Sequence, residues 1–318
     1  MNTFNKIPSL DLNDFKSKDL SKKLNFVKKL GEAYEEVGFL SLKNYGLSNN
    51  LEKELYEEIE SFFNLPIEIK SKYEKPELNG QRGYVSFGKE KAKGYKKSDL
   101  KEFWHFGQEL SKDDPLIHEY EPNVFCNELP NFNKIGRKVF KKLEKTGIYI
   151  LQALAMYLQL PNNYFDKKVN GGNSILRAIH YPPIKTEPKG AVRAAAHGDI
   201  NLITILMGAS AAGLEVQTRS GKWIPVTALP NQVVVNIGDM MSRLTNNKLH
   251  SSIHQVVNPP KKDWSKPRFS IPFFMHPRSE MSLNCLACCI DEKNPKQFED
   301  ITAGSFLEER IKELGLKK

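Results

Sequence analysis

Residues 197–204 read His-Gly-Asp-Ile-Asn-Leu-Ile-Thr, with a histidine and a carboxylate two positions apart at the entrance to an apolar run. In an extended chain such side chains point to the same side, so His197 and Asp199 can reach one ion together. His254, at 254 − 199 = 55 residues after Asp199, is the best candidate for a third ligand. Two histidines and one carboxylate are typical of non-haem Fe(II) oxygenases. The pattern predicts an iron site with positions open for a chelating substrate and O₂.

The histidine–aspartate pair alone is weak evidence, because most such pairs arise by chance. Three other histidines, at positions 180, 250 and 276, are alternatives for the third ligand. His250 ranks lower because it belongs to a turn, and His180 would face the opposite side of its strand from Tyr181.

The region around this motif predicts the fold. From about residue 174, short runs rich in Ile, Val, Leu and aromatic residues alternate with Gly, Pro and Asn turns. Several short strands without intervening helices indicate a sandwich, a barrel or a jelly roll. The expected strands are 175–181, 202–207, 214–218, 223–226, 233–237, 253–257 and 269–275.

The last of these strands carries a candidate anion anchor. Arg268 and Ser270 are two positions apart and share a face. A guanidinium and a hydroxyl suit a carboxylate, because the guanidinium gives bidentate, charge-assisted hydrogen bonds. Tyr181 could add a phenolic donor. The alternative is a structural salt bridge at Arg268 and a serine placed there by chance.

The remainder of the chain is mixed. A short strand is expected near residues 7–12 and another at 39–42, and Pro161 is expected to end the longest helix. Apolar residues at helical spacing predict helices over 21–37, 49–63, 132–158 and 303–318.

The composition is that of an ordinary globular protein, with 40% apolar and 27% charged residues. No run reaches the length of a membrane span, and no signal peptide is recognised. Four cysteines are too few for a disulfide scaffold, so a reducing cytoplasm is expected. Cys285, Cys288 and Cys289 lie in an apolar, strand-like run and are expected to be buried free thiols; a CxxC metal or redox site is the alternative.

The formal net charge is +9, which raises the alternative of a nucleic-acid-binding protein. The lysines are scattered along the chain, and their densest run lies at residues 89–97 around a glycine. We interpret that run as a solvated loop, so nucleic acid is not the expected partner.

Four side chains are candidates for contacting a substrate. Arg193 and His197 are an even number of residues apart, as are Arg177 and Tyr181. On an extended strand each pair shares a face, so either arginine could point into a barrel and meet an anion. Arg82 could reach over the mouth, and Phe274 could line the cavity. The alternative for Arg193 and Arg177 is a salt bridge. For Arg82 it is a place in a turn, and for Phe274 a place in the core.

In their order along the chain, these motifs resemble the isopenicillin N synthase-like 2-oxoglutarate/Fe(II)-dependent dioxygenases. The resemblance extends from about residue 5 to 315. It rests on IPSLD (7–11), GFL (38–40), NYG (44–46), LKEF (100–103), HGDINLIT (197–204), GLEV (213–216), VVNIGD (234–239), SIHQVVNP (252–259) and PRFSIPFF (267–274).

The resemblance implies a mainly β fold with flanking helices and a double-stranded β-helix (jelly roll) core. Iron would be bound by His197, Asp199 and His254, and 2-oxoglutarate by Arg268 and Ser270 with help from Tyr181. The expected reaction hydroxylates or desaturates a small molecule with O₂, releasing succinate and CO₂. The implied division is an N-terminal α/β region (1–125), a long helix and linker (126–172), the jelly-roll core (173–280) and a C-terminal strand and helix (281–318).

Two features depart from many relatives. Gly198 stands where a bulkier or polar residue is common, and Arg268 follows His254 by 268 − 254 = 14 residues, which predicts a longer turn. A second hypothesis is an oxidase of the isopenicillin N synthase type, which needs no 2-oxoglutarate. A monomer or weak dimer is expected. The sequence does not identify the primary substrate.

Overall fold

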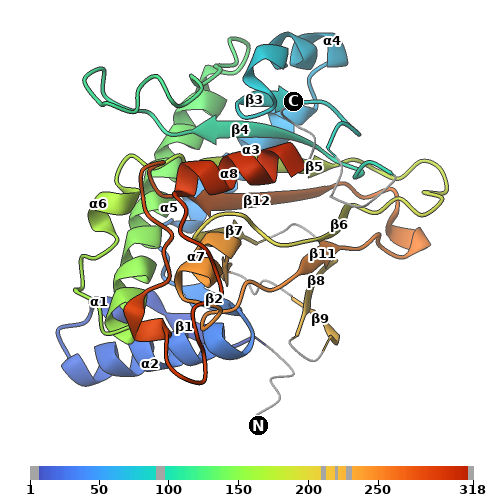
Figure 1. Ribbon diagram of the computed structural model, residues 1–318. Coiled ribbons are helices and arrows are strands. Elements are labelled where there is room, and N and C mark those ends of the chain that lie inside the picture. The colour runs from blue at the N-terminus through green and yellow to red at the C-terminus, as the bar shows by residue number, and fades with distance from the viewer. Residues whose placement is uncertain (1–6, 91–96, 209–212, 219–220, 227–230, 314–318) are drawn as a thin grey trace.

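The computed structural model describes residues 7–90, 97–208, 213–218, 221–226 and 231–313. Two sheets and a set of flanking helices make up the protein (Figure 1). The larger sheet has eight strands, antiparallel except for the β1–β2 pair. Their spatial order is β1 (Ser9–Asp11), β2 (Phe39–Lys43), β10 (Gln232–Ile237), β7 (Ile203–Met207), β12 (Arg268–Met275), β5 (Ile175–Tyr181), β4 (Glu102–Gly107) and β3 (Gly83–Val85).

The smaller sheet has four antiparallel strands and faces the larger one. Apolar side chains from both sheets meet between them, among them Ile179, Val234, Val216 and Val256. The two sheets therefore share an apolar core. The strands are, in spatial order, β6 (Ala194–His197), β11 (His254–Val256), β8 (Leu214–Gln217) and β9 (Trp223–Pro225).

Helices cover the other face of the larger sheet. Along β12, Ile271 and Phe273 belong to the core that includes the helices, whereas Arg268 and Ser270 alternate with them. Figure 1 shows α2 and α5 on the opposite side from the smaller sheet. The α-helices are α1 (Leu12–Lys16), α2 (Leu20–Glu36), α3 (Asn49–Phe63), α4 (Ile67–Lys70), α5 (Pro130–Tyr157), α6 (Asp166–Val169), α7 (Asp239–Leu244) and α8 (Ala303–Glu313).

Local sequence explains where the helices begin and end. The Asp19 carboxylate accepts hydrogen bonds from the backbone at the start of α2, and Ser48 caps α3 in the same way. The longest helix, α5, ends at Tyr157, before the predicted stop at Pro161, because Gln159 adopts a left-handed backbone with φ of 57°. None of the helices in the described residues has the length and apolar character of a bilayer-crossing segment.

Several expectations about the elements need correction. The strands β3, β4 and β6 and the helix α7 were not predicted. The N-terminal region supplies β1 to β4 to the same sheet as the later strands, with β2 paired to β10. The C-terminal segment contains an isolated Ser282–Thr302 bridge before α8, in place of the expected strand. The last residues of the predicted final helix, 314–318, and the lysine run at 91–96 lie outside the described residues.

The cysteine segment also differs from expectation. Residues Ala287–Cys289 form a 3-10 turn, and Cys288 is exposed while Cys289 is buried. The Sγ atoms of these two residues are 3.9 Å apart, so they are free thiols in contact. The expectation of free thiols is confirmed, but that of uniform burial in a strand is wrong.

Candidate metal and co-substrate site

The three predicted metal ligands come together between the sheets. His197 ends β6 and pairs with His254 on β11, and Asp199 follows in the loop that leads to β7. One donor atom from each residue lies within 4.8 Å of the other two. The imidazole centroids are 4.5 Å apart, and His254 Nε2 is 3.8 Å from Asp199 Oδ1. Among the described residues this is the one cluster of His, Cys, Asp or Glu that could hold a metal ion.

Hydrogen bonds orient each of these side chains. His197 Nδ1 is 2.7 Å from Ala195 O, and because a carbonyl oxygen can only accept, Nδ1 carries the proton and Nε2 keeps its lone pair. Asp199 Oδ2 accepts from Thr204 Oγ1 at 2.7 Å and from Asn236 Nδ2 at 2.8 Å. The other carboxylate oxygen, Oδ1, therefore remains for a metal.

The charges of the cluster suit a divalent cation. Burial lowers the pKa of His197 to about 4, so the ring is neutral near pH 7. Burial alone would raise the pKa of Asp199, but His254, His197 and the two hydrogen bonds hold it below its usual value. One nitrogen from each of two histidines and one carboxylate are the donor set that non-haem Fe(II) oxygenases use, so these residues fit Fe(II).

The rival histidines lie outside the cluster. His180 is on the opposite face of β5, where its Nδ1 is 2.7 Å from Glu102 Oε1 and its ring stacks on Phe269. His276 follows β12 and is buried, and burial lowers its pKa to about 4. His250 lies in the irregular segment before β11.

The predicted anion anchor lies on neighbouring strands of the larger sheet. Arg268 is directly opposite Tyr181 in the β12–β5 register, and its guanidinium carbon is 4.9 Å from the Tyr181 ring centroid. Arg268 and Ser270 are 1% and 3% exposed, so both are removed from bulk water. The lengthened connection before Arg268 contains the 3-10 turn Lys261–Asp263.

The candidate substrate residues have different surroundings. Arg177 Nη1 pairs with Glu90 at 3.1 Å, and the guanidinium lies over the rings of Phe103 and Phe274, at 4.3 and 5.3 Å from their centroids. It lies on the face of β5 that also bears Tyr181.

Arg82 and Arg193 are both buried. Arg82 donates to Gln81 O and Asn173 Oδ1 and packs against Gly107, so it holds loop and strand together. The guanidinium carbon of Arg193 is 5.8 Å from the Tyr181 centroid. The β6–β11 register shifts between His197 and Ala194, so strict alternation does not extend from His197 back to Arg193.

Some residues of the site escaped the sequence analysis. Thr204 and Asn236 donate hydrogen bonds to Asp199. Each is a single polar residue within an apolar strand, and that feature of the sequence could have indicated a buried hydrogen-bonding role. Glu90, Asp99 and Lys101 form a buried ion cluster, with Lys101 Nζ 2.6 Å from Glu90 and 2.9 Å from Asp99. Nothing in their local sequence predicts this cluster, because its members meet only in the fold.

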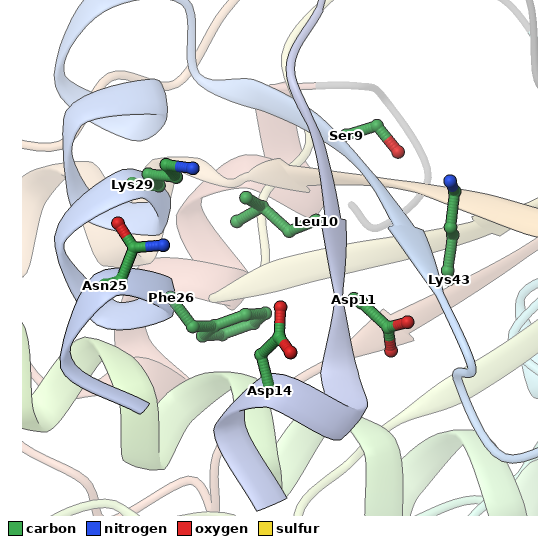
Figure 2. Close-up of a pocket in the computed structure, with 8 residues that line it drawn as sticks. All are labelled: Ser9, Leu10, Asp11, Asp14, Asn25, Phe26, Lys29 and Lys43. Carbon is green, nitrogen blue, oxygen red and sulfur yellow. The ribbon is translucent and has the colours of Figure 1, made fainter. Parts of the chain in front are cut away.

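A separate cavity of about 190 Å³ opens among β1, α1, α2 and β2 (Figure 2). None of its lining residues belongs to the metal or anchor groups, and Asp11 is already bonded by Asn44. The cavity therefore does not contribute to the site. It is lined by Ser9, Leu10, Asp11, Asp14, Asn25, Phe26, Lys29 and Lys43.

Comparison with known proteins identifies related families and relatives of this chain. Residues 172–277 match the model of the 2OG-Fe(II) oxygenase superfamily, and residues 7–131 match that of the non-haem dioxygenase in morphine synthesis N-terminal region. Proline hydroxylase buaE of Petromyces alliaceus is 31% identical, over 96% of this chain and 98% of the relative. The 2-oxoglutarate-dependent dioxygenase htyE of Aspergillus rugulosus is 30% identical, over 92% and 94%.

Solved structures give the same result. A putative 2OG-Fe(II) oxygenase family protein from Caulobacter crescentus is 40% identical with a TM-score of 0.88, covering 97% of this chain and 99% of that one. A full-length Neurospora crassa protein, solved in complex with alpha-KG and thymine, is 30% identical with a TM-score of 0.85, covering 98% of each chain.

Fold and site together define a mononuclear non-haem iron oxygenase. The chain belongs to the 2OG-Fe(II) oxygenase superfamily and is a 2-oxoglutarate/Fe(II)-dependent dioxygenase, whose cofactors are Fe(II), 2-oxoglutarate and O₂. The predicted family and reaction class are thereby confirmed.

Proposed function

We propose that His197, Asp199 and His254 hold Fe(II), and that Arg268 and Ser270, assisted by Tyr181, bind the far carboxylate of 2-oxoglutarate. The observation that carries this proposal is the convergence of two imidazoles and one oriented carboxylate, with donor atoms within 4.8 Å. The two sheets that frame the site are inferred to be the double-stranded β-helix, or jelly roll, of the family.

When bound, iron, 2-oxoglutarate and O₂ supply the oxidising chemistry, which releases succinate and CO₂. The protein contributes geometry. Thr204 and Asn236 keep Asp199 Oδ2 engaged, so the carboxylate would offer Oδ1 alone to the metal. Burial of Arg268 strengthens its attraction for a carboxylate, because water does not screen the charge.

The primary substrate is proposed to be a compact polar molecule that is hydroxylated or desaturated. Arg177 Nε and Nη1 are bonded to His105 and Glu90, and Nη2 has no hydrogen bond to any described residue. A substrate oxygen can accept from Nη2 while an apolar or planar part lies against Phe274. The thymine bound to the Neurospora crassa protein is a molecule of this kind.

The remaining expectations stay proposals. A cytoplasmic location is consistent with the free thiols at Cys288 and Cys289. A monomer or weak dimer is proposed. Arg82 is proposed to stabilise the fold and not to bind substrate.

Succinate release tests the proposal. The purified enzyme with Fe(II), 2-oxoglutarate and O₂ is assayed against a panel of pyrimidine bases, free amino acids and small carboxylic acids, with product analysis by mass spectrometry. We expect succinate to form in a ratio near one to one with an oxidised product. Product formation without succinate would favour the oxidase hypothesis instead.

The Arg177→Met variant tests the substrate assignment, with the exposed Arg137→Met as its matched control. Arg177→Met should lose coupling between succinate and product while keeping Fe(II) and 2-oxoglutarate binding. Unchanged coupling would remove Arg177 from the substrate site.

A further inference from the structure

Arg193 is a buried cation whose hydrogen bonding is incomplete. Its side chain is 2% exposed, and its one hydrogen bond within the described part of the chain is a long one, from Nη2 to Lys266 O at 3.3 Å. Arg193 Nε is buried and finds no acceptor among these residues. A buried donor without an acceptor is unfavourable, so its presence calls for a partner such as a water, an ion or a ligand.

The charge of Arg193 is also unbalanced. Arg177 is paired with Glu90, and Lys101 with both Glu90 and Asp99. No carboxylate of the described residues lies within ion-pair distance of Arg193, whereas burial and the nearby Arg268 both lower its pKa. Buried charges are normally paired, so this position favours an anion that the chain itself does not supply.

Strand register places Arg193 at the co-substrate end of the site. Asp199 is bonded to Thr204, which lies opposite Phe274 on β12. Arg268 is six residues from Phe274 on the same strand, a separation of about 20 Å along the sheet. Because both Arg268 and Arg193 approach the ring of Tyr181, at 4.9 and 5.8 Å, they occupy the end remote from Phe274.

On the proposed function, the primary substrate would lie at the end of the site where Arg177 is near Phe274. A dicarboxylate whose 2-oxo acid end bound the metal would extend toward the other end, where both guanidinium groups lie near the Tyr181 ring. This position separates Arg193 from the substrate residues, among which its sequence had placed it.

We infer that Arg193 is a second anchor for the far carboxylate of 2-oxoglutarate, acting with Arg268, and that it sets the preference for a dicarboxylate over other 2-oxo acids. This inference rests on the proposed role of Arg268. Two charge-assisted donors on one carboxylate discriminate more strongly than one, since an analogue without that carboxylate forgoes both interactions.

The test compares two ligands that differ only at the far end. The intact protein with Fe(II) is titrated without O₂ with 2-oxoglutarate and with 2-oxopentanoate, and binding is measured by calorimetry and by the visible charge-transfer band. Arg193→Gln should weaken 2-oxoglutarate binding about 10- to 100-fold and leave 2-oxopentanoate binding unchanged. Arg193→Lys, which keeps the charge, should retain most of the preference.

The melting temperature of the Arg193→Gln variant separates the anchor role from a merely structural one. The anchor role predicts the following result. Removing an unpaired buried charge should leave the melting temperature of the ligand-free protein unchanged or higher, while the stabilisation by 2-oxoglutarate decreases. Arg193→Met, which keeps the aliphatic stem beside Tyr181, replaces Arg193→Gln if the latter does not fold.

The outcomes are distinguishable. If Arg193→Gln keeps the wild-type ratio of the two affinities while Arg268→Gln loses it, the inference is wrong. If Arg268→Gln also keeps that ratio, the proposed co-substrate anchor itself fails.

Discussion

At the scale of single residues, the site depends on hydrogen bonds that fix one carboxylate. Thr204 Oγ1 donates to Asp199 Oδ2 and accepts from Asn201 Nδ2 at 2.9 Å. The threonine hydroxyl thus connects the metal ligand to a buried amide. This connection explains why a polar residue occupies an otherwise apolar strand.

Replacing Thr204 by valine should weaken Fe(II) binding about 10- to 100-fold, because Asp199 loses one of the two donors that orient it. Thr204→Ser keeps the hydroxyl and is the matched control. The measurement is the dissociation constant of the metal for the apoprotein. Equal affinities for the valine and serine variants would show that the hydroxyl does not position Asp199.

Two histidines with lowered pKa values, His197 and His276, give the metal-free protein a predictable pH dependence. The pKa of His197 and that of His276 are each lowered by burial to about 4, below the ordinary value of 6.5. The pKa of each histidine is lower in the folded protein than in the unfolded chain. The contribution of each neutral ring to the free energy of unfolding is therefore present above pH 6.5 and is lost as the pH falls toward 4. The free energy of unfolding should decrease between pH 7 and pH 5 by on the order of 2 kcal/mol per histidine.

Urea denaturation at both pH values, with a chelator present, checks this expectation. His276→Gln should reduce the difference between the two pH values, whatever its effect at pH 7. A difference equal to that of the wild type would contradict the assignment to His276.

The sequence was informative about residues where alternation is regular. Arg268 and Ser270 do share the face of β12 that also bears Phe274. Alternation is not regular before His197, because an irregularity changes the β6–β11 register between Ala194 and His197. Thr204 and Asn236 could not be assigned, since their partner is fixed only by the tertiary structure.

At the scale of elements, helix α5 packs closely against the larger sheet. Gly136 faces the Phe106 ring of β4, and a methyl group added at Gly136 would overlap that ring. Phe106 is held in turn by Phe132, with ring centroids 5.0 Å apart, and by Trp104 at 6.0 Å. The ring therefore has little room to move.

Gly136→Ala should lower the free energy of unfolding by about 1–3 kcal/mol, as overpacked core positions do. Lys138→Ala, on the exposed side of the same helix, is the control and should be nearly neutral. Chemical denaturation measures both. A neutral Gly136→Ala would contradict a close contact between Gly136 of α5 and the Phe106 ring of β4.

Element prediction succeeded for long amphipathic helices and apolar strands, such as α3 and β7, whose periodicity is carried by the local sequence. It missed β3 and β6, which have three and four residues, because such short strands are defined by their partners. The strand β4 was missed because it is buried on both faces and so shows no alternation.

At the scale of the whole molecule, the N-terminal region and the later strands form one sheet. The strand β2 pairs with β10 along five residues, and β4 pairs with β5 along six. Phe39 of β2 also contacts the His254 ring, with centroids 5.8 Å apart. The metal site therefore depends on residues from both regions.

The two regions should unfold in one transition. In a Trp223→Phe/Trp264→Phe variant, fluorescence reports only on Trp104 in β4, whereas far-UV circular dichroism reports on the whole chain. The two denaturation midpoints should coincide. An earlier loss of the Trp104 signal would indicate that the N-terminal region is an independent unit.

The most direct test of the central claim is the addition of Fe(II) and then 2-oxoglutarate to the apoprotein without O₂, with observation of the weak visible charge-transfer band. We expect the band in the wild type and in the exposed control variants His118→Ala and Arg137→Ala. It should be absent in His197→Ala and weaker in Arg268→Ala. Iron binding without the band would favour the oxidase hypothesis, and a wild-type protein that binds no iron would contradict the account.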